Sequence, residues 1–82
     1  MPILRRMSTS DLPHTPQSMR ALRGLTQLEL AAKSDVSDRT IRHLEGGEDV
    51  SLDTLRRVAS ALGVTFDALV AAHDVARAQA GK

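Results

Sequence analysis

Four polar residues that can make directed hydrogen bonds lie within one short stretch of the chain: Asp38, Arg39, Arg42 and His43. Ile41 and Leu44 are three residues apart, so a helix would turn both apolar side chains to one face and leave the polar ones on the other. Helices that read DNA place polar side chains of this kind against the edges of the bases. The stretch therefore predicts a short helix with one buried face and one face suited to base recognition.

Two helix starts position this face. Thr26 and Glu29 fit the capping box, in which each side chain accepts a hydrogen bond from the other residue's amide, so we expect a helix over residues 27–34. Ser37 is a second N-cap, directly in front of the polar stretch. Only two residues separate the two helices, and Asp35 tolerates the left-handed backbone that so tight a turn needs.

Three further helices are predicted from the same kinds of signal. Thr15 caps a helix whose first residue is Pro16 and which Gly24 ends. Ser51 and Thr65 cap the two helices that follow. The apolar residues expected in these two helices are Leu52, Leu55, Ala59 and Leu62 in the first and Phe66, Leu69 and Val70 in the second.

This pattern resembles the Cro/lambda-repressor-type helix-turn-helix family, also called the Xre family. The matching residues are Leu25, Thr26, Gln27, Leu30, Ala31, Val36, Ser37, Thr40, Ile41, Leu44, Glu45, Gly47, Leu55, Ala59, Leu62, Gly63, Val64 and Leu69. The resemblance covers residues 17–70 and is specific, because these matches extend from the second predicted helix to the last. It implies an all-α fold, a compact five-helix lambda-repressor-like domain with a helix-turn-helix, and binding to double-stranded DNA.

The resemblance and the polar face together give the expected DNA contacts. The residues expected to face the bases are Ser37, Asp38, Arg39, Arg42 and His43. The residues expected to contact the DNA backbone are Thr26, Gln27, Thr40, Gly46 and Gly47. The family also implies that Gln27 braces the recognition helix, which follows Ser37, and that Arg20 forms a structural ion pair with Glu45 at its end.

Three features depart from the family pattern. Asp35 stands where family members usually carry glycine, so we expect slight strain in the turn. The loop of residues 46–50 is acidic instead of basic, which disfavours side-chain contacts with phosphate, and we expect the amides of its two glycines to bind phosphate instead. Asp38 either accepts a hydrogen bond from cytosine N4 or holds Arg39 in place for guanine.

The composition fits a small DNA-binding module. The 82 residues allow one domain with a modest core, and without cysteine there is neither a disulfide nor a thiolate metal site. No apolar run has the length of a membrane span or the character of a signal peptide, so we expect a cytoplasmic protein. The net charge is +1, but residues 26–50 carry six acidic and three basic residues. We therefore expect weak non-specific DNA binding, which depends on neutralising phosphates.

No catalytic or metal-binding pattern is found in the sequence. His14, His43 and His73 are far apart and lack the spacing of metal ligands. There is no nucleophile elbow and no glycine-rich phosphate loop, so we expect neither enzymatic activity nor a cofactor. Phe66 is the only aromatic residue, which argues against stacking on RNA or single-stranded DNA.

The two ends of the chain are expected to lie outside the DNA-binding domain of residues 15–72. Residues 1–14 form a flexible arm, in which Arg5 and Arg6 are candidates for the minor groove. Alternatively the arm stays unengaged, or it adds a strand in an oligomer. Residues 73–82 form a helical extension, which their alanines favour, or a tail.

We expect dimerisation through the last helix. A small five-helix core has little room for all of its apolar residues, and an exposed apolar patch indicates a partner surface. The expected interface residues are Phe66, Leu69, Val70 and Val75, although Phe66 and Leu69 alternatively belong to the core. A two-fold dimer would place two recognition helices about one DNA turn apart, which predicts a palindromic operator.

Two hypotheses about function follow. The first is a dimeric transcriptional repressor, with the controller protein of a restriction-modification system as a close variant. The second is the antitoxin of a toxin–antitoxin pair, which binds a cognate toxin and also regulates its own operon. A neighbouring gene for a toxin-like enzyme or for a restriction enzyme would distinguish these hypotheses.

Overall fold

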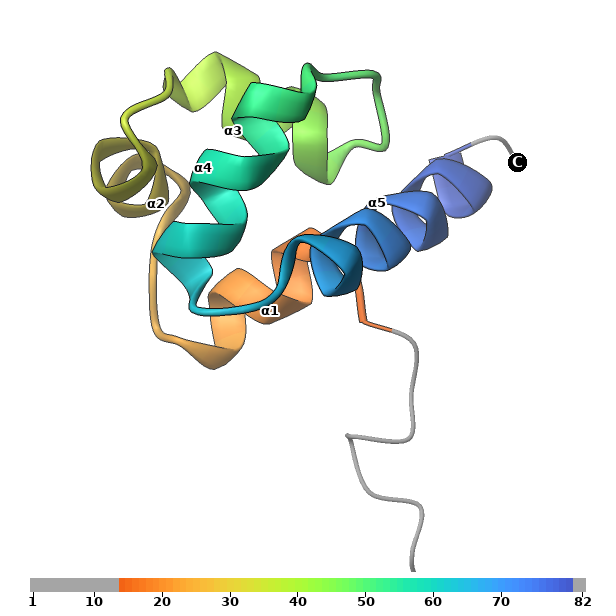
Figure 1. The fold of residues 1–82 in the computed structure, drawn as a ribbon, viewed down its shortest axis with the longest axis horizontal. Helices are drawn as coiled ribbons and strands as arrows, with labels where there is room; N and C mark the ends of the chain where they lie inside the picture. Colours follow the sequence, from red (N-terminus) through yellow and green to blue (C-terminus); the bar gives the residue numbers. More distant parts are fainter. Residues whose placement is uncertain (1–13, 81–82) are drawn as a thin grey trace, which may run out of the picture.

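Helix α4 lies at the centre of a bundle of five helices (Figure 1). A computed structural model describes residues 14–80 of the chain. Its helices are α1 Pro16–Leu22, α2 Gln27–Ser34, α3 Asp38–Glu45, α4 Leu52–Leu62 and α5 Phe66–Ala80. Helix α4 packs against α2 on one side and against α5 on another. The all-α, five-helix fold expected from the sequence is confirmed.

Every helix begins after the capping residue predicted for it. In each case the hydroxyl oxygen of the capping residue accepts a hydrogen bond of 3.0–3.1 Å from the amide three residues later. The five capping residues are Thr15, Thr26, Ser37, Ser51 and Thr65. Thr26 completes a capping box, since its own amide donates to Glu29 at 2.8 Å. Caps of this kind each stabilise a helix by about 1 kcal/mol, and they explain why short helices begin at defined positions.

The turn between α2 and α3 depends on one left-handed residue. Asp35 has φ 60° and ψ 42°, and among residues 14–80 it is the only non-glycine residue with a positive φ. The following amide, that of Val36, donates to the carbonyl of Ala31 at 3.1 Å and closes the end of α2. The left-handed backbone predicted for Asp35 is confirmed. Aspartate adopts it more readily than most residues, though less readily than glycine.

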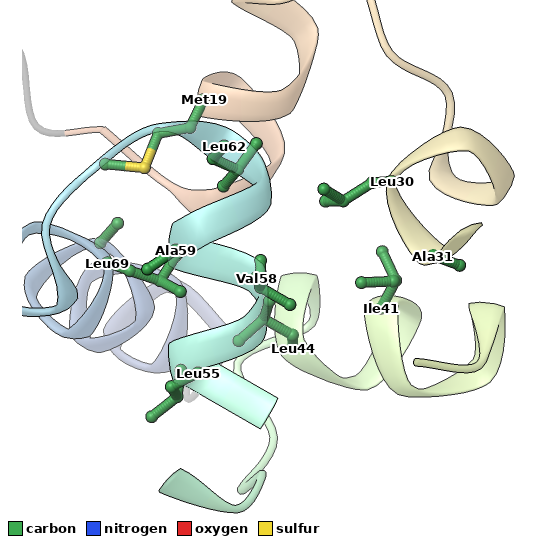
Figure 2. Packing of buried hydrophobic residues seen from close by; sticks show 11 residues of the cluster. Met19, Leu30, Ala31, Ile41, Leu44, Leu55, Val58, Ala59, Leu62 and Leu69 are labelled. Atoms are coloured by element: carbon green, nitrogen blue, oxygen red, sulfur yellow. The ribbon is translucent and has the colours of Figure 1, made fainter. Parts of the chain in front are cut away.

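The hydrophobic core lies between α4 and the helices packed around it (Figure 2). Figure 2 shows Val58 of α4 beside Leu44 of α3, with Leu30 and Ile41 on the neighbouring helices α2 and α3. All four side chains, together with Leu69 of α5, are 0% exposed. Full burial of one such side chain stabilises a fold by about 1.5–3 kcal/mol, so these residues fix how α3 sits on the bundle.

Helix α4 buries a slightly different set of residues from the one predicted. Leu55, Ala59 and Leu62 face the core as expected, but Leu52 is 62% exposed. Leu52 is the first residue of α4, and its side chain lies past the edge of the core, one turn before Leu55. Val58 is fully buried instead, because it lies three residues after Leu55 on the same face of the helix.

The loop between α3 and α4 passes near α5 (Figure 1), and three contacts hold it there. Nε2 of His73 donates to the carbonyl of Glu48 at 2.7 Å, and Arg77 forms an ion pair with the next residue of the loop. Gly47, with φ 82°, lies so close to α5 that an added Cβ atom would be 2.7 Å from the carbonyl oxygen of Ala76. Only glycine combines this backbone conformation with so close an approach.

Helix α5 runs without a break through the alanine-rich segment to Ala80. His73 and Ala76 of that segment are buried, so it packs on the rest of the bundle. Within residues 14–80 no single helix is long and apolar enough to cross a membrane, and α4 and α5 reach that length only as a pair bent by 110°.

Gly47→Ala is expected to cost at least about 2 kcal/mol of unfolding free energy, clearly more than Gly63→Ala. Both glycines have a positive φ, of 82° and 73°, so both substitutions carry a conformational cost of about 1 kcal/mol. At Gly63 the new Cβ meets nothing within 4 Å, whereas at Gly47 it meets the backbone of α5. Urea unfolding followed by circular dichroism measures both variants, and equal costs would contradict the tight packing of the loop on α5.

Candidate nucleic-acid interface

Helix α3 has the two faces that its sequence predicts. Ile41 and Leu44 are fully buried, whereas Arg39 and Arg42 are exposed and His43 is half-buried. The residues that line an open hollow on this outer surface are Arg39, Arg42, His43 and Glu48. The hydrogen-bonding groups therefore face solvent together, while the apolar residues of the same helix anchor it to the core.

The C-terminal end of α3 is tied to α1 and α2 through one buried carboxylate. Glu45, whose side chain is 6% exposed, accepts from Arg20 Nε at 2.6 Å and from Arg20 Nη2 at 3.1 Å. Gln27 Nε2 donates to the same carboxylate at 2.9 Å. The expected ion pair and the expected bracing by Gln27 are both present. A bidentate pair fixes geometry as well as contributing energy, so it sets the direction in which α3 leaves the bundle.

Asp38 pairs with Arg42 and not with Arg39. Its Oδ2 accepts a hydrogen bond from Arg42 Nη1 at 2.7 Å. Residues four apart are neighbours on a helix surface, and the acidic residue comes first, which is the favourable order. The interpretation that Asp38 holds Arg39 in place for guanine is therefore wrong. A contact between Asp38 and cytosine stays a prediction.

Arg39 is hydrogen-bonded to His43 instead. Arg39 Nε donates to His43 Nε2 at 3.3 Å, and His43 Nδ1 lies 2.6 Å from Oε1 of Glu48. The sequence pointed to Glu48 only as a charge that repels phosphate. Its contact with His43 crosses the end of α3 and spans five residues, so no helical spacing signals it. The contact becomes visible only once the path of the loop is known.

The amides of Gly46 and Gly47 are not free to bind phosphate, contrary to the prediction. Gly46 donates to the carbonyl of Arg42 at 2.9 Å, and Gly47 donates to the carbonyl of Leu44 at 3.2 Å. Both glycines follow the C-terminus of α3, where amides turn back to satisfy the last carbonyls of the helix. The C-terminus of α3 is also the negative end of the helix dipole, which disfavours binding of an anion such as phosphate.

Three hydroxyl groups predicted to contact DNA take part in helix caps. Ser37 Oγ and Thr40 Oγ1 lie 2.8 Å apart, and Thr26 Oγ1 accepts from the amide three residues later. All three residues remain at least partly exposed, so their contacts with DNA stay predictions. Arg5 and Arg6, the candidates for the minor groove, lie outside the described residues.

All six acidic side chains of residues 26–50 accept hydrogen bonds within the fold. These residues are Glu29, Asp35, Asp38, Glu45, Glu48 and Asp49. Arg20, Arg57 and Arg77, which lie outside this stretch, pair with three of them. The hydrogen bond and charge of Asp53, helped by Asp35, raise the pKa of Arg57. Arginines from other elements thus pair with three of the six carboxylates and offset part of the local charge of −3.

Leu69 is fully buried in the core, so it is not available to a second chain. Its place in the predicted dimer interface is wrong, and the alternative that makes it a core residue is confirmed. Phe66, Val70 and Val75 are half-buried. The guanidinium of Arg56 lies over the ring of Phe66, 5.7 Å from its centroid, which covers one part of the ring.

The chain matches a family model described as Helix-turn-helix over residues 17–69, more than half of its length. The matched part begins in α1 and ends in α5, so it includes the pair of Arg20 and Glu45 and the whole of α3. No curated protein and no solved structure matches the chain.

Glu45→Ala is expected to lower the free energy of unfolding by about 3 kcal/mol, because the largely buried guanidinium of Arg20 loses its counter-charge. Gln27 loses its acceptor at the same time. Arg57→Ala is the control, since its ion pairs are exposed and exposed pairs contribute little. Urea titration measures both. If Glu45→Ala shifts the unfolding midpoint no more than the control, the carboxylate does not hold α3 in place.

Proposed function

Since the chain belongs to the lambda-repressor-type (Xre) helix-turn-helix family of DNA-binding transcription regulators, we propose that it is a dimeric repressor that reads a palindromic operator. The observation that carries this proposal is the exposed polar face of α3, with Arg39, Arg42 and His43 around one hollow. Each half-site of the operator would receive one α3 in its major groove. Occupying a promoter in this way blocks transcription.

Arg39 is the main base-reading residue in this proposal. Its Nε is directed to His43, and its two terminal nitrogens make no hydrogen bond with any described residue. Two such donors match O6 and N7 of guanine, which is the commonest specific contact of arginine with DNA. Arg42 and Asp38 next to it offer a donor and an acceptor in a fixed pair, which suits the neighbouring base pair.

The proposed backbone contacts lie at the start of α2 and on α3. Thr26 and Thr40 are at least partly exposed. Gln27 Nε2 donates one hydrogen to Glu45, and its second hydrogen can donate to a phosphate. These groups are uncharged. Because few cations are released from phosphates on binding, the affinity should fall only gently with rising salt concentration.

We place the dimer interface on one side of α5. Ala68, Ala71 and Val75 recur at helical spacing and line an open, mostly apolar hollow next to α1. Phe66 and Val70 lie on the other flank of the helix, since the five residues from Val70 to Val75 turn it by about 140°. An exposed apolar stripe supports a protein partner, and a second copy provides the two-fold symmetry that a palindrome requires.

Arg39→Ala is expected to weaken specific DNA binding by about 1–3 kcal/mol, as for the loss of one bidentate guanine contact. Arg56→Ala is the matched control, because Arg56 is also exposed but lines a separate hollow. Fluorescence anisotropy measures the affinity of both variants for a duplex selected from a random pool by the wild-type protein. Unchanged affinity in Arg39→Ala, with unchanged circular dichroism, would remove Arg39 from base recognition.

Selection of bound duplexes from a random pool is expected to return an inverted repeat with half-sites about 10–11 base pairs apart. Val75→Arg places a charge in the proposed interface and should make the protein monomeric in sedimentation equilibrium. The variant should then bind the repeat far more weakly, while its helical content stays unchanged.

A single, non-repeated motif would contradict the dimer but leave a DNA-binding regulator. No enrichment from a folded protein would contradict the repressor and favour the antitoxin hypothesis. In that case a toxin-like protein, if the neighbouring gene encodes one, becomes the binding partner to test.

A further inference from the structure

The two acidic residues of the α3–α4 loop face different parts of the protein. Glu48 extends toward α3, where its Oε1 lies 2.6 Å from His43 Nδ1. Asp49 extends toward α5, where it pairs with Arg77. Both side chains are mostly exposed, at 63% and 84%. The two neighbouring carboxylates carry the same charge, but only Glu48 contacts the base-reading face.

The directions of the hydrogen bonds determine which nitrogen of His43 carries the proton. Arg39 Nε can only donate, so His43 Nε2, at 3.3 Å from it, must be the acceptor. A neutral imidazole then carries its hydrogen on Nδ1, which donates to the carboxylate of Glu48. A doubly protonated ring would place two donors face to face and lose the bond with Arg39. The three side chains therefore form one ordered chain of hydrogen bonds.

Glu48 is itself fixed through its backbone. Its amide donates to the carbonyl of His43 at 2.9 Å, and its carbonyl accepts from Nε2 of buried His73 at 2.7 Å. Gly47, the residue before it, is packed directly on α5. The carboxylate of Glu48 therefore starts from a backbone position that both α3 and α5 define.

We propose that Glu48 is a positioning residue for base recognition. It fixes His43 as the Nδ1–H tautomer, His43 Nε2 accepts from Arg39 Nε, and the terminal nitrogens of Arg39 are thereby directed outward for guanine. The inference rests on the proposed DNA-binding function and assigns the loop a role in specificity. The same negative charge repels phosphates, so Glu48 lowers non-specific affinity while it improves discrimination.

The contact gains importance when DNA is bound. In the free protein an exposed ion pair or hydrogen bond contributes little. Docking of α3 in the major groove removes water from around His43 and Arg39, and hydrogen bonds strengthen as the local dielectric constant falls. An arginine that already points in the right direction also loses less conformational entropy on binding.

The first test is the tautomer of His43 in the free protein, measured by nitrogen-15 NMR of the imidazole rings at about pH 8, where an ordinary imidazole is neutral. We expect Nδ1–H for His43 in the wild type and in Asp49→Ala, and a shift toward Nε2–H in Glu48→Ala. His73, which donates through Nε2, provides the spectrum of the other tautomer in the same sample. An Nε2–H tautomer for His43 in the wild type overturns the proposal.

The second test is the specificity ratio, which is the affinity for the selected duplex divided by the affinity for a scrambled one. Glu48→Ala should lower this ratio by about three- to tenfold, as for loss of one typical hydrogen bond, without weakening binding to the scrambled duplex. Asp49→Ala removes the same charge from the next residue and should leave the ratio unchanged.

Equal changes in the two variants, or no change in Glu48→Ala, overturn the proposal, because charge alone would then account for the effect of the loop. Absence of any preferred duplex for the wild type contradicts the proposed function as a whole. The NMR result separates these cases, since the tautomer of His43 is measured without DNA.

Discussion

The buried carboxylate of Glu45 is the constraint on which the rest of the structure depends. A helix of eight residues such as α3 is not stable alone, so contacts with its neighbours must set its position. Glu45 connects the end of α3 to Arg20 of α1 and to Gln27 of α2, while Ile41 and Leu44 are buried beneath it. Because both the apolar face and the last residue of α3 are fixed, the orientation of its polar face is fixed as well.

The arrangement of charge fits the proposed role, in which discrimination between sequences matters more than tight binding. The helix-turn-helix region is acidic by sequence, which is unusual for a domain that approaches phosphates. In the fold, arginines from α1, α4 and α5 pair with Glu45, Asp35 and Asp49. These three carboxylates are therefore paired and compete less for Arg39 and Arg42, the exposed arginines of α3. In the proposed function, weak attraction to any DNA together with directed contacts to a few bases would make base sequence decide where the protein binds.

Most of the fold could be predicted from local signals, because capping residues, turn residues and apolar spacing act over three or four positions. The faces of α3 and the left-handed turn at Asp35 belong to this class. The contact of Glu48 with His73 and the close approach of Gly47 to α5 could not be predicted, since they join segments at least 25 residues apart. The contact of Glu48 with His43 spans only five residues, but it depends on the path of the same loop. The sequence alone predicts phosphate contacts for the amides of Gly46 and Gly47, because it does not show that carbonyls at the end of α3 already accept from them.

The packing of Gly47 on α5 makes one rigid unit of α3, its following loop and the face of α5 proposed for dimerisation. In such a dimer the two reading helices would keep a fixed separation and a fixed relative rotation. One extra base pair between half-sites turns them by roughly 35° and moves them by roughly 3.4 Å. Because the loop between α3 and α4 is packed against α5, it would not act as a flexible hinge that adjusts to the altered spacing. The double helix would therefore have to overwind or bend. Base pairs at the centre of the operator, untouched by any side chain, would then influence binding through their torsional stiffness.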